Sequence, residues 1–80
     1  MDNTLWYNEN DKKGKIEAIM REVYDALKEK GYDPVSQIVG YILSGDPTYI
    51  TSHNGARALI TKVERDDFLE ELVKNYLSKF

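Results

Sequence analysis

Few side chains in this 80-residue chain have the types and spacing of a catalytic site. The one histidine, His53, stands in a predicted connecting segment, where an imidazole could act as a general base. The chain has no cysteine and no second histidine, so no nucleophile and base are paired around it. We therefore interpret His53 as a cap or surface residue and expect a protein that is not an enzyme. Retained biological activity after His53→Ala would exclude the catalytic alternative.

The acidic residues near the C-terminus could in principle hold a divalent cation. Five carboxylates gather there: Glu64, Asp66, Asp67, Glu70 and Glu71. Their spacing lacks the alternating oxygen ligands and central glycine of a calcium loop, and carboxylates are also favourable near a helix N-terminus. Residues 44–47 (Ser-Gly-Asp-Pro) lack the glycines and the Lys-Ser/Thr pair of a phosphate-binding loop. We expect neither a metal nor a cofactor.

Aromatic side chains offer a different kind of chemistry, namely stacking and partner contact. Tyr24, Tyr41 and Tyr76 fall in or beside apolar stripes, which favours packing over stacking on nucleic-acid bases. Trp6 and Tyr7 lie in a polar segment without apolar periodicity, where exposed aromatics gain little unless they dock. The sequence leaves open whether they dock on the protein's own body or on a partner.

Composition limits the compartment and the class of partner. The net charge of −3 and pI near 5.0 disfavour nonspecific nucleic-acid binding. A small helical nucleic-acid-binding module remains the alternative, because the spacing between Pro34 and Val63 resembles a helix-loop-helix. The sequence shows no cysteine, no secretion signal and no apolar run of about 20 residues, so we expect a cytoplasmic protein without membrane contact.

Hydrophobic periodicity predicts an all-α fold of about four main helices plus a short helical turn. We divide the chain into a flexible N-terminal arm, 1–14, and a single helical domain, 15–80. The first helix runs from Lys15 to a stop at Gly31, and the second begins at 33–34 (Asp-Pro) and ends at Gly45. A turn opens at 46–47 (Asp-Pro), and Ser52 or Asn54 caps the third helix.

The apolar residues predict which face of each helix is buried. The first three faces comprise Ile16, Ile19, Met20, Val23, Tyr24 and Leu27; Val35, Ile38, Val39, Ile42 and Leu43; and Ala56, Leu59, Ile60 and Val63. The last helix carries a stripe too broad for one small neighbour to cover: Phe68, Leu69, Leu72, Val73, Tyr76, Leu77 and Phe80. Since a chain this short is marginal alone, the surplus predicts a homodimer.

Residues 29–50 read Glu-Lys-Gly-Tyr-Asp-Pro-Val-Ser-Gln-Ile-Val-Gly-Tyr-Ile-Leu-Ser-Gly-Asp-Pro-Thr-Tyr-Ile, a string similar to the signature of the IreB/ReoM family of bacterial regulatory phosphoproteins. The resemblance continues through 56–57, 64–66 and 70–73 to 76–77. It implies a small helical homodimer whose N-terminal arm is phosphorylated by a PASTA-type Ser/Thr kinase and dephosphorylated by the partner phosphatase. It also implies control of peptidoglycan synthesis and cephalosporin tolerance, in some members through ClpCP-dependent degradation of MurA.

The resemblance points to two kinds of site residue. Thr4 is the expected phosphorylation site, because 2–7 (Asp-Asn-Thr-Leu-Trp-Tyr) resembles the family's arm motif, although some relatives carry two threonines there. Arg57 and Arg65 are the expected partner-binding residues. They stand eight apart with Thr61 midway, which would place all three on one helical face, and guanidinium groups suit carboxylate or phosphate. The alternative is that the arginines only pair with nearby acids in solvent.

Overall fold

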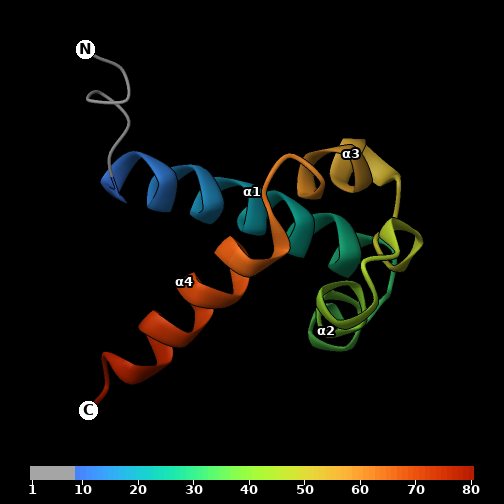
Figure 1. Ribbon diagram of the computed structural model, residues 1–80. Helices are drawn as coiled ribbons and strands as arrows, with labels where there is room; N and C mark the ends of the chain where they lie inside the picture. Colours follow the sequence, from blue (N-terminus) through green and yellow to red (C-terminus); the bar gives the residue numbers. More distant parts are fainter. Residues whose placement is uncertain (1–8) are drawn as a thin grey trace.

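Residues 9–80 are described by the computed structural model, with side chains from Asp11 onward. This part of the chain contains four α-helices and two short 3-10 helices and no strand (Figure 1). In chain order they are α1 (Glu9–Glu29), α2 (Pro34–Ser44), η1 (Pro47–Tyr49), η2 (His53–Gly55), α3 (Ala56–Ile60) and α4 (Arg65–Leu77). The predicted all-α class, with four helices and a turn after the second, is confirmed.

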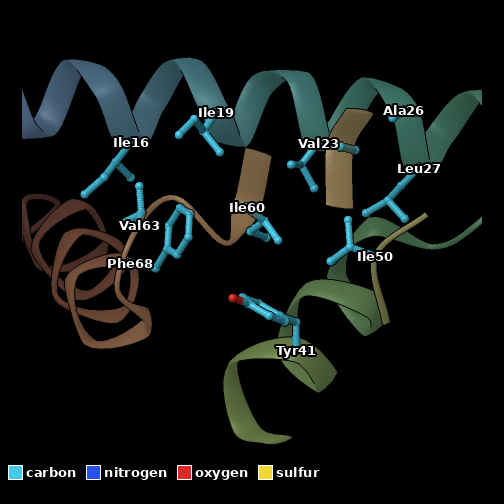
Figure 2. Packing of buried hydrophobic residues seen from close by; sticks show 11 residues of the cluster. Ile16, Ile19, Val23, Ala26, Leu27, Tyr41, Ile50, Ile60, Val63 and Phe68 are labelled. Atoms are coloured by element: carbon cyan, nitrogen blue, oxygen red, sulfur yellow. The ribbon is translucent and has the colours of Figure 1, made fainter. Parts of the chain in front are cut away.

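The core is built on one face of α1. Its side chains at the three-and-four spacing point toward α3 and toward residues from the two later connections (Figure 2). The buried residues are Ile16, Ile19, Val23, Ala26, Leu27, Tyr41, Ile50, Ala56, Ile60, Val63 and Phe68. Every element after α1 contributes at least one residue to this cluster except the two 3-10 turns, so α1 organises the domain.

The other helices take different positions relative to α1. In Figure 1, α3 runs along one side of α1, α2 crosses near its C-terminal end, and α4 projects away from the other elements toward the C-terminus. No helix within residues 9–80 is long and apolar enough to cross a membrane.

Helix α1 begins at Glu9, six residues before the predicted start at Lys15. The predicted boundary between arm and domain therefore does not fall at Gly14, which lies inside the helix. A glycine in a helix interior costs roughly 0.5–1 kcal/mol relative to alanine, which is why the sequence suggested a break there. The ammonium of Lys12 lies 3.0 Å from a carboxylate oxygen of Asp67 on α4, and this contact ties the early turns to the body. Residues 1–8 of the predicted arm lie outside the described part.

The predicted ends of α1 and α2 are confirmed by backbone geometry. Gly31 and Gly45 adopt φ of 81° and 76°, the left-handed region in which glycine avoids the Cβ penalty. Pro34 occupies the first turn of α2, and the Asp33 carboxylate before it accepts a 2.7 Å hydrogen bond from the Ser36 hydroxyl. That bond lowers the pKa of Asp33 below its ordinary 3.8.

The third helix differs most from its prediction. It spans only Ala56–Ile60 and is preceded by η2, because Asn54 (φ 54°) and Gly55 (φ 73°) both take left-handed conformations that interrupt a helix. Neither Ser52 nor Asn54 provides the predicted side-chain cap, since Gly55 occupies the position before α3. Val63 follows the helix instead of lying in it, yet it is buried as expected.

Candidate partner-binding surface

Helix α4 leaves most of its apolar stripe uncovered. Phe68 is fully buried, whereas the remaining members are between 41% and 90% exposed: Leu69, Leu72, Val73, Tyr76, Leu77 and Phe80. The predicted surplus of apolar surface on the last helix is therefore present. Monomeric soluble proteins rarely expose a contiguous apolar patch of this kind without using it for binding.

Helix α2 adds an apolar stripe that the sequence analysis assigned to the core. Val35, Val39 and Leu43 are 70%, 48% and 79% exposed, so their predicted inward orientation is wrong. Tyr41 instead enters the core, while Ile38 and Ile42 pack against it partly buried. An 11-residue helix that is apolar on nearly every side cannot bury all of its faces against one small domain, and this excess was the signal in the sequence.

The two exposed stripes border one groove over α1. The groove is lined by Met20 and Tyr24 of α1, by Ile38 and Val39 of α2, and by Leu72 of α4. The groove has a volume of about 470 Å³ and a largely apolar lining. Tyr24, predicted to be buried, is 49% exposed here. We call the exposed residues of α2 and α4 named above, together with this groove, the apolar face.

Arg57 lies half-buried on α3, next to the segment that follows η1. Its Nε donates a 2.8 Å hydrogen bond to the carbonyl oxygen of Ile50, a fully buried residue. This bond orients the guanidinium, and its two terminal nitrogens remain for further contacts. A guanidinium held in this way is suited to a forked interaction with a carboxylate or phosphate.

Arg65 is the first residue of α4 and is exposed. Its Nη1 donates a 2.8 Å hydrogen bond to the carbonyl oxygen of Ile42, in the last turn of α2. Carbonyls at a helix C-terminus lack partners within the helix, and a cation there also meets the negative end of the helix dipole. Arg65 therefore joins the end of α2 to the beginning of α4.

The predicted arrangement of the two arginines on one helical face is wrong. Arg57 belongs to α3 and Arg65 to α4, because α3 ends at Ile60 and Thr61 closes it by donating its hydroxyl to the Ala58 carbonyl at 2.8 Å. The solvent-pairing alternative is also not what the structure records. Within residues 11–80, both guanidinium groups contact backbone carbonyls, and neither forms an ion pair with Glu64, Asp66 or Glu70.

Asp46 adds a negative charge near Arg57, at the start of η1. Its carboxylate accepts hydrogen bonds from the Thr48 hydroxyl at 2.7 Å and the Thr48 backbone N–H at 3.0 Å, which fixes the start of η1. The Thr48 hydroxyl bond and then the backbone bond hold the pKa of Asp46 below its ordinary value, with a smaller contribution from the charge of Arg57. Sequence reasoning treated this residue only as a helix start.

His53 and the acidic residues play local roles. The Nε2 of His53 lies 2.8 Å from an Oε1 of Glu29, so the imidazole connects η2 to the end of α1. Asp66 and Asp67 lie in the first turn of α4, as predicted for carboxylates near a helix N-terminus. In the described part of the chain, no three His, Asp or Glu side chains form a group that could hold a metal ion.

The geometry of residues 34–63 differs from that of a DNA-reading helix-turn-helix. A DNA-reading helix-turn-helix joins its helices by a turn of roughly three or four residues. Here α2 and α3 are separated by Gly45–Gly55 with two 3-10 turns, and α3 is only five residues long. The remaining predicted site residues, Thr4, Trp6 and Tyr7, lie outside the described residues.

A comparison with known protein families matches residues 2–78 of this chain to a family described as IreB regulatory phosphoprotein. The match covers nearly the whole chain, including all four helices and the predicted phosphorylation motif.

Proposed function

The chain belongs to the IreB family of regulatory phosphoproteins, and from this premise we propose that it is a non-enzymatic regulator that acts by binding other proteins. The observation that carries the proposal is the apolar face. It supports a binding role because five apolar side chains of α4, and Phe80 just after the helix, are at least 41% exposed in so small a domain.

We further propose that a PASTA-type Ser/Thr kinase phosphorylates Thr4 and that a partner phosphatase reverses the reaction. The other three threonines have engaged hydroxyls: Thr48 donates to Asp46, Thr61 donates to Ala58, and Thr51 accepts from the backbone of His53. Phosphorylation adds about 1.5 to 2 negative charges and three acceptor oxygens at neutral pH, enough to change how the protein meets a charged partner.

The proposed output is control of peptidoglycan synthesis and cephalosporin tolerance, by governing ClpCP-dependent degradation of MurA. Arg57 and Arg65 would supply the anion-binding contacts, either to carboxylates of a partner or to the phosphorylated arm, through N–H groups not used for the carbonyls of Ile50 and Ile42. Trp6 and Tyr7 would add apolar contact area beside the phosphorylated residue. The cytoplasm is the compartment in which these proposed partners would meet.

We propose that a second copy of this chain covers the apolar face. Isologous pairing would let α2 and α4 of one copy cover those of the other, and it would explain why apolar residues outnumber those one core can bury. The same pairing would bring two arginine pairs and two arms into one assembly.

The test is phosphorylation of the full chain by a PASTA-type kinase, with mass-spectrometric site mapping. We expect wild type and the control Thr61→Ala to incorporate phosphate equally and Thr4→Ala to lose it. Binding to the ClpC and MurA components is then measured for both phosphorylation states. Unchanged incorporation in Thr4→Ala would contradict the site, and equal binding by the two states would contradict the switch.

A further inference from the structure

Helix α4 is attached to the body by few contacts. Phe68 is its one buried residue, and it lies in the first turn. Lys12 of α1 pairs with Asp67 at 3.0 Å in the same turn. Both contacts fix where α4 begins, and farther along the helix Leu72 and Asn75 line a pocket with Ile16 and Met20 of α1. These contacts hold α4 against α1, and none of them joins it to the end of α2.

Arg65 makes the contact between α4 and α2. Its Nη1 reaches the Ile42 carbonyl at 2.8 Å, across 23 residues of sequence. The adjacent carbonyl, that of Tyr41, accepts a 2.7 Å hydrogen bond from the backbone N–H of Gly45. Arg65 therefore donates to the next carbonyl of the C-terminal turn, which the backbone of the turn does not serve.

Gly45 shapes the place where the guanidinium lies. Its φ of 76° requires glycine for the turn, and the missing side chain also makes room for Arg65. A Cβ at this position would lie 2.8 Å from the Arg65 Cζ and 2.9 Å from its Nη2, closer than side-chain atoms tolerate. The guanidinium is thus packed on the α2 terminus as well as hydrogen-bonded to it.

The direction of α4 determines the shape of the apolar face. Leu72 lies two helical turns after Arg65 and lines the groove together with Ile38 and Val39 of α2. A rotation of α4 about its first turn would move Leu72, and the apolar residues beyond it, away from α2. The groove exists only while the two helices keep their present angle.

We propose that Arg65 is a positioning residue that sets the angle between α2 and α4 and thereby assembles the apolar face. Its consequence for assembly rests on the function proposed above, whereas its effect on the helix angle does not. In this role Arg65 acts through the α2 terminus, and the role is separate from the anion contact proposed for Arg65 above.

The experiment measures the distance between α4 and the start of α2 by double electron–electron resonance. The chain contains no cysteine, so Val35→Cys, at a 70% exposed position, and Asn75→Cys place two spin labels without background. Labelled protein is diluted in unlabelled protein so that only distances within one chain are measured. Arg65→Ala should broaden and shift the distribution, Arg65→Lys should restore most of it because an ammonium still donates to the Ile42 carbonyl, and the matched control Arg21→Ala should equal wild type.

Circular dichroism of each variant checks that helix content is retained. A distribution for Arg65→Ala that matches wild type would overturn the proposal, as would equal broadening in Arg21→Ala or no restoration by lysine. The dissociation constant of the dimer, measured in parallel, should rise roughly tenfold in Arg65→Ala, which is the order of effect expected from the loss of a charge-assisted hydrogen bond. A changed distance in Arg65→Ala, together with a wild-type protein that never dimerises, would support the positioning role and contradict the proposed dimer.

Discussion

Helices α1 and α4 carry similar apolar stripes, but only the stripe of α1 is buried. Five residues of α1 are buried, because α3, the two later connections and the start of α4 all pack on its inner face. On α4 only Phe68 is buried, and the stripe continues uncovered to the C-terminus. A helical apolar period therefore indicates which side of a helix avoids water, but not whether the same chain supplies the cover.

The difference follows from how much structure is available to each helix. The elements after α1 return to it, and α3 is short enough to lie along one side of it. Within residues 9–80, no element covers the exposed side of α4. The comparison between α1 and α4 is thus one between a buried core and an exposed apolar surface, which we propose is covered on assembly. Four substitutions test this comparison.

The largest expected effect comes from Phe68→Ala, which removes the buried anchor of α4. Truncation of a fully buried phenylalanine typically costs about 3–5 kcal/mol of unfolding free energy, a large share of the stability of a small domain. Urea denaturation at one fixed protein concentration measures this. The neighbouring Leu69→Ala, at a half-exposed position, should cost less than about 1 kcal/mol. Equal losses in both variants would remove the distinction between the two sides of α4.

The second prediction concerns the uncovered side of α4. Leu77→Asp should weaken the proposed dimer by about 2 kcal/mol, close to 30-fold in dissociation constant, because a carboxylate would be buried at the interface. Ala58→Asp on the exposed part of α3 is the control and should leave assembly unchanged. Light scattering over a concentration series distinguishes the two. A wild-type monomer well above ~10 micromolar would contradict the dimer itself.

The third prediction moves from apolar to charged contacts. Arg57→Ala should weaken partner binding by about 1.5 kcal/mol, roughly tenfold, since a charge-assisted hydrogen bond would be lost. Arg21→Ala, an exposed arginine on α1, removes the same charge elsewhere and should bind as wild type. Binding is measured by titration calorimetry with the phosphorylated and unphosphorylated protein. Equal affinities in the two variants would contradict a role of Arg57 in partner binding and leave only its structural contact with the Ile50 carbonyl.

The smallest expected effect lies in the turn that begins η1. Thr48→Ala removes the hydroxyl that hydrogen-bonds Asp46, so the lowered pKa of Asp46 should rise toward its ordinary 3.8. Because the folded-state pKa is lowered, the ionised carboxylate favours the folded state above pH 3.8, and this contribution is lost as the pH falls through the lowered pKa. NMR titration of the Asp46 carboxyl carbon measures the change. A pKa unchanged in Thr48→Ala, or shifted equally in the control Thr61→Ala, would contradict the assignment.

Local signals account for the parts of the fold that the sequence predicted. Left-handed glycines end α1 and α2, Pro34 and Pro47 stand in the first turns of α2 and η1, and the stripe on α4 is as broad and uncovered as expected. These features depend on residues within a turn or two of one another, so their spacing along the chain was sufficient. The family was predicted from the resemblance of residues 29–50 to its signature, and the family match over residues 2–78 confirms it.

The positions of Arg57 and Arg65 were decided only by tertiary structure. Spacing placed them on one helix, but two left-handed residues, Asn54 and Gly55, delay the start of α3, and Thr61 closes it before Arg65. Each guanidinium then finds a carbonyl 7 or 23 residues away. The orientation of α2, which buries Tyr41 and exposes Leu43, could likewise not be predicted from the hydrophobic pattern. In a helix with apolar residues on all sides, the neighbouring elements decide which face is buried. Turn chemistry is local and can be read along the chain, whereas the partner of a side chain depends on which distant backbone the fold brings within 3 Å.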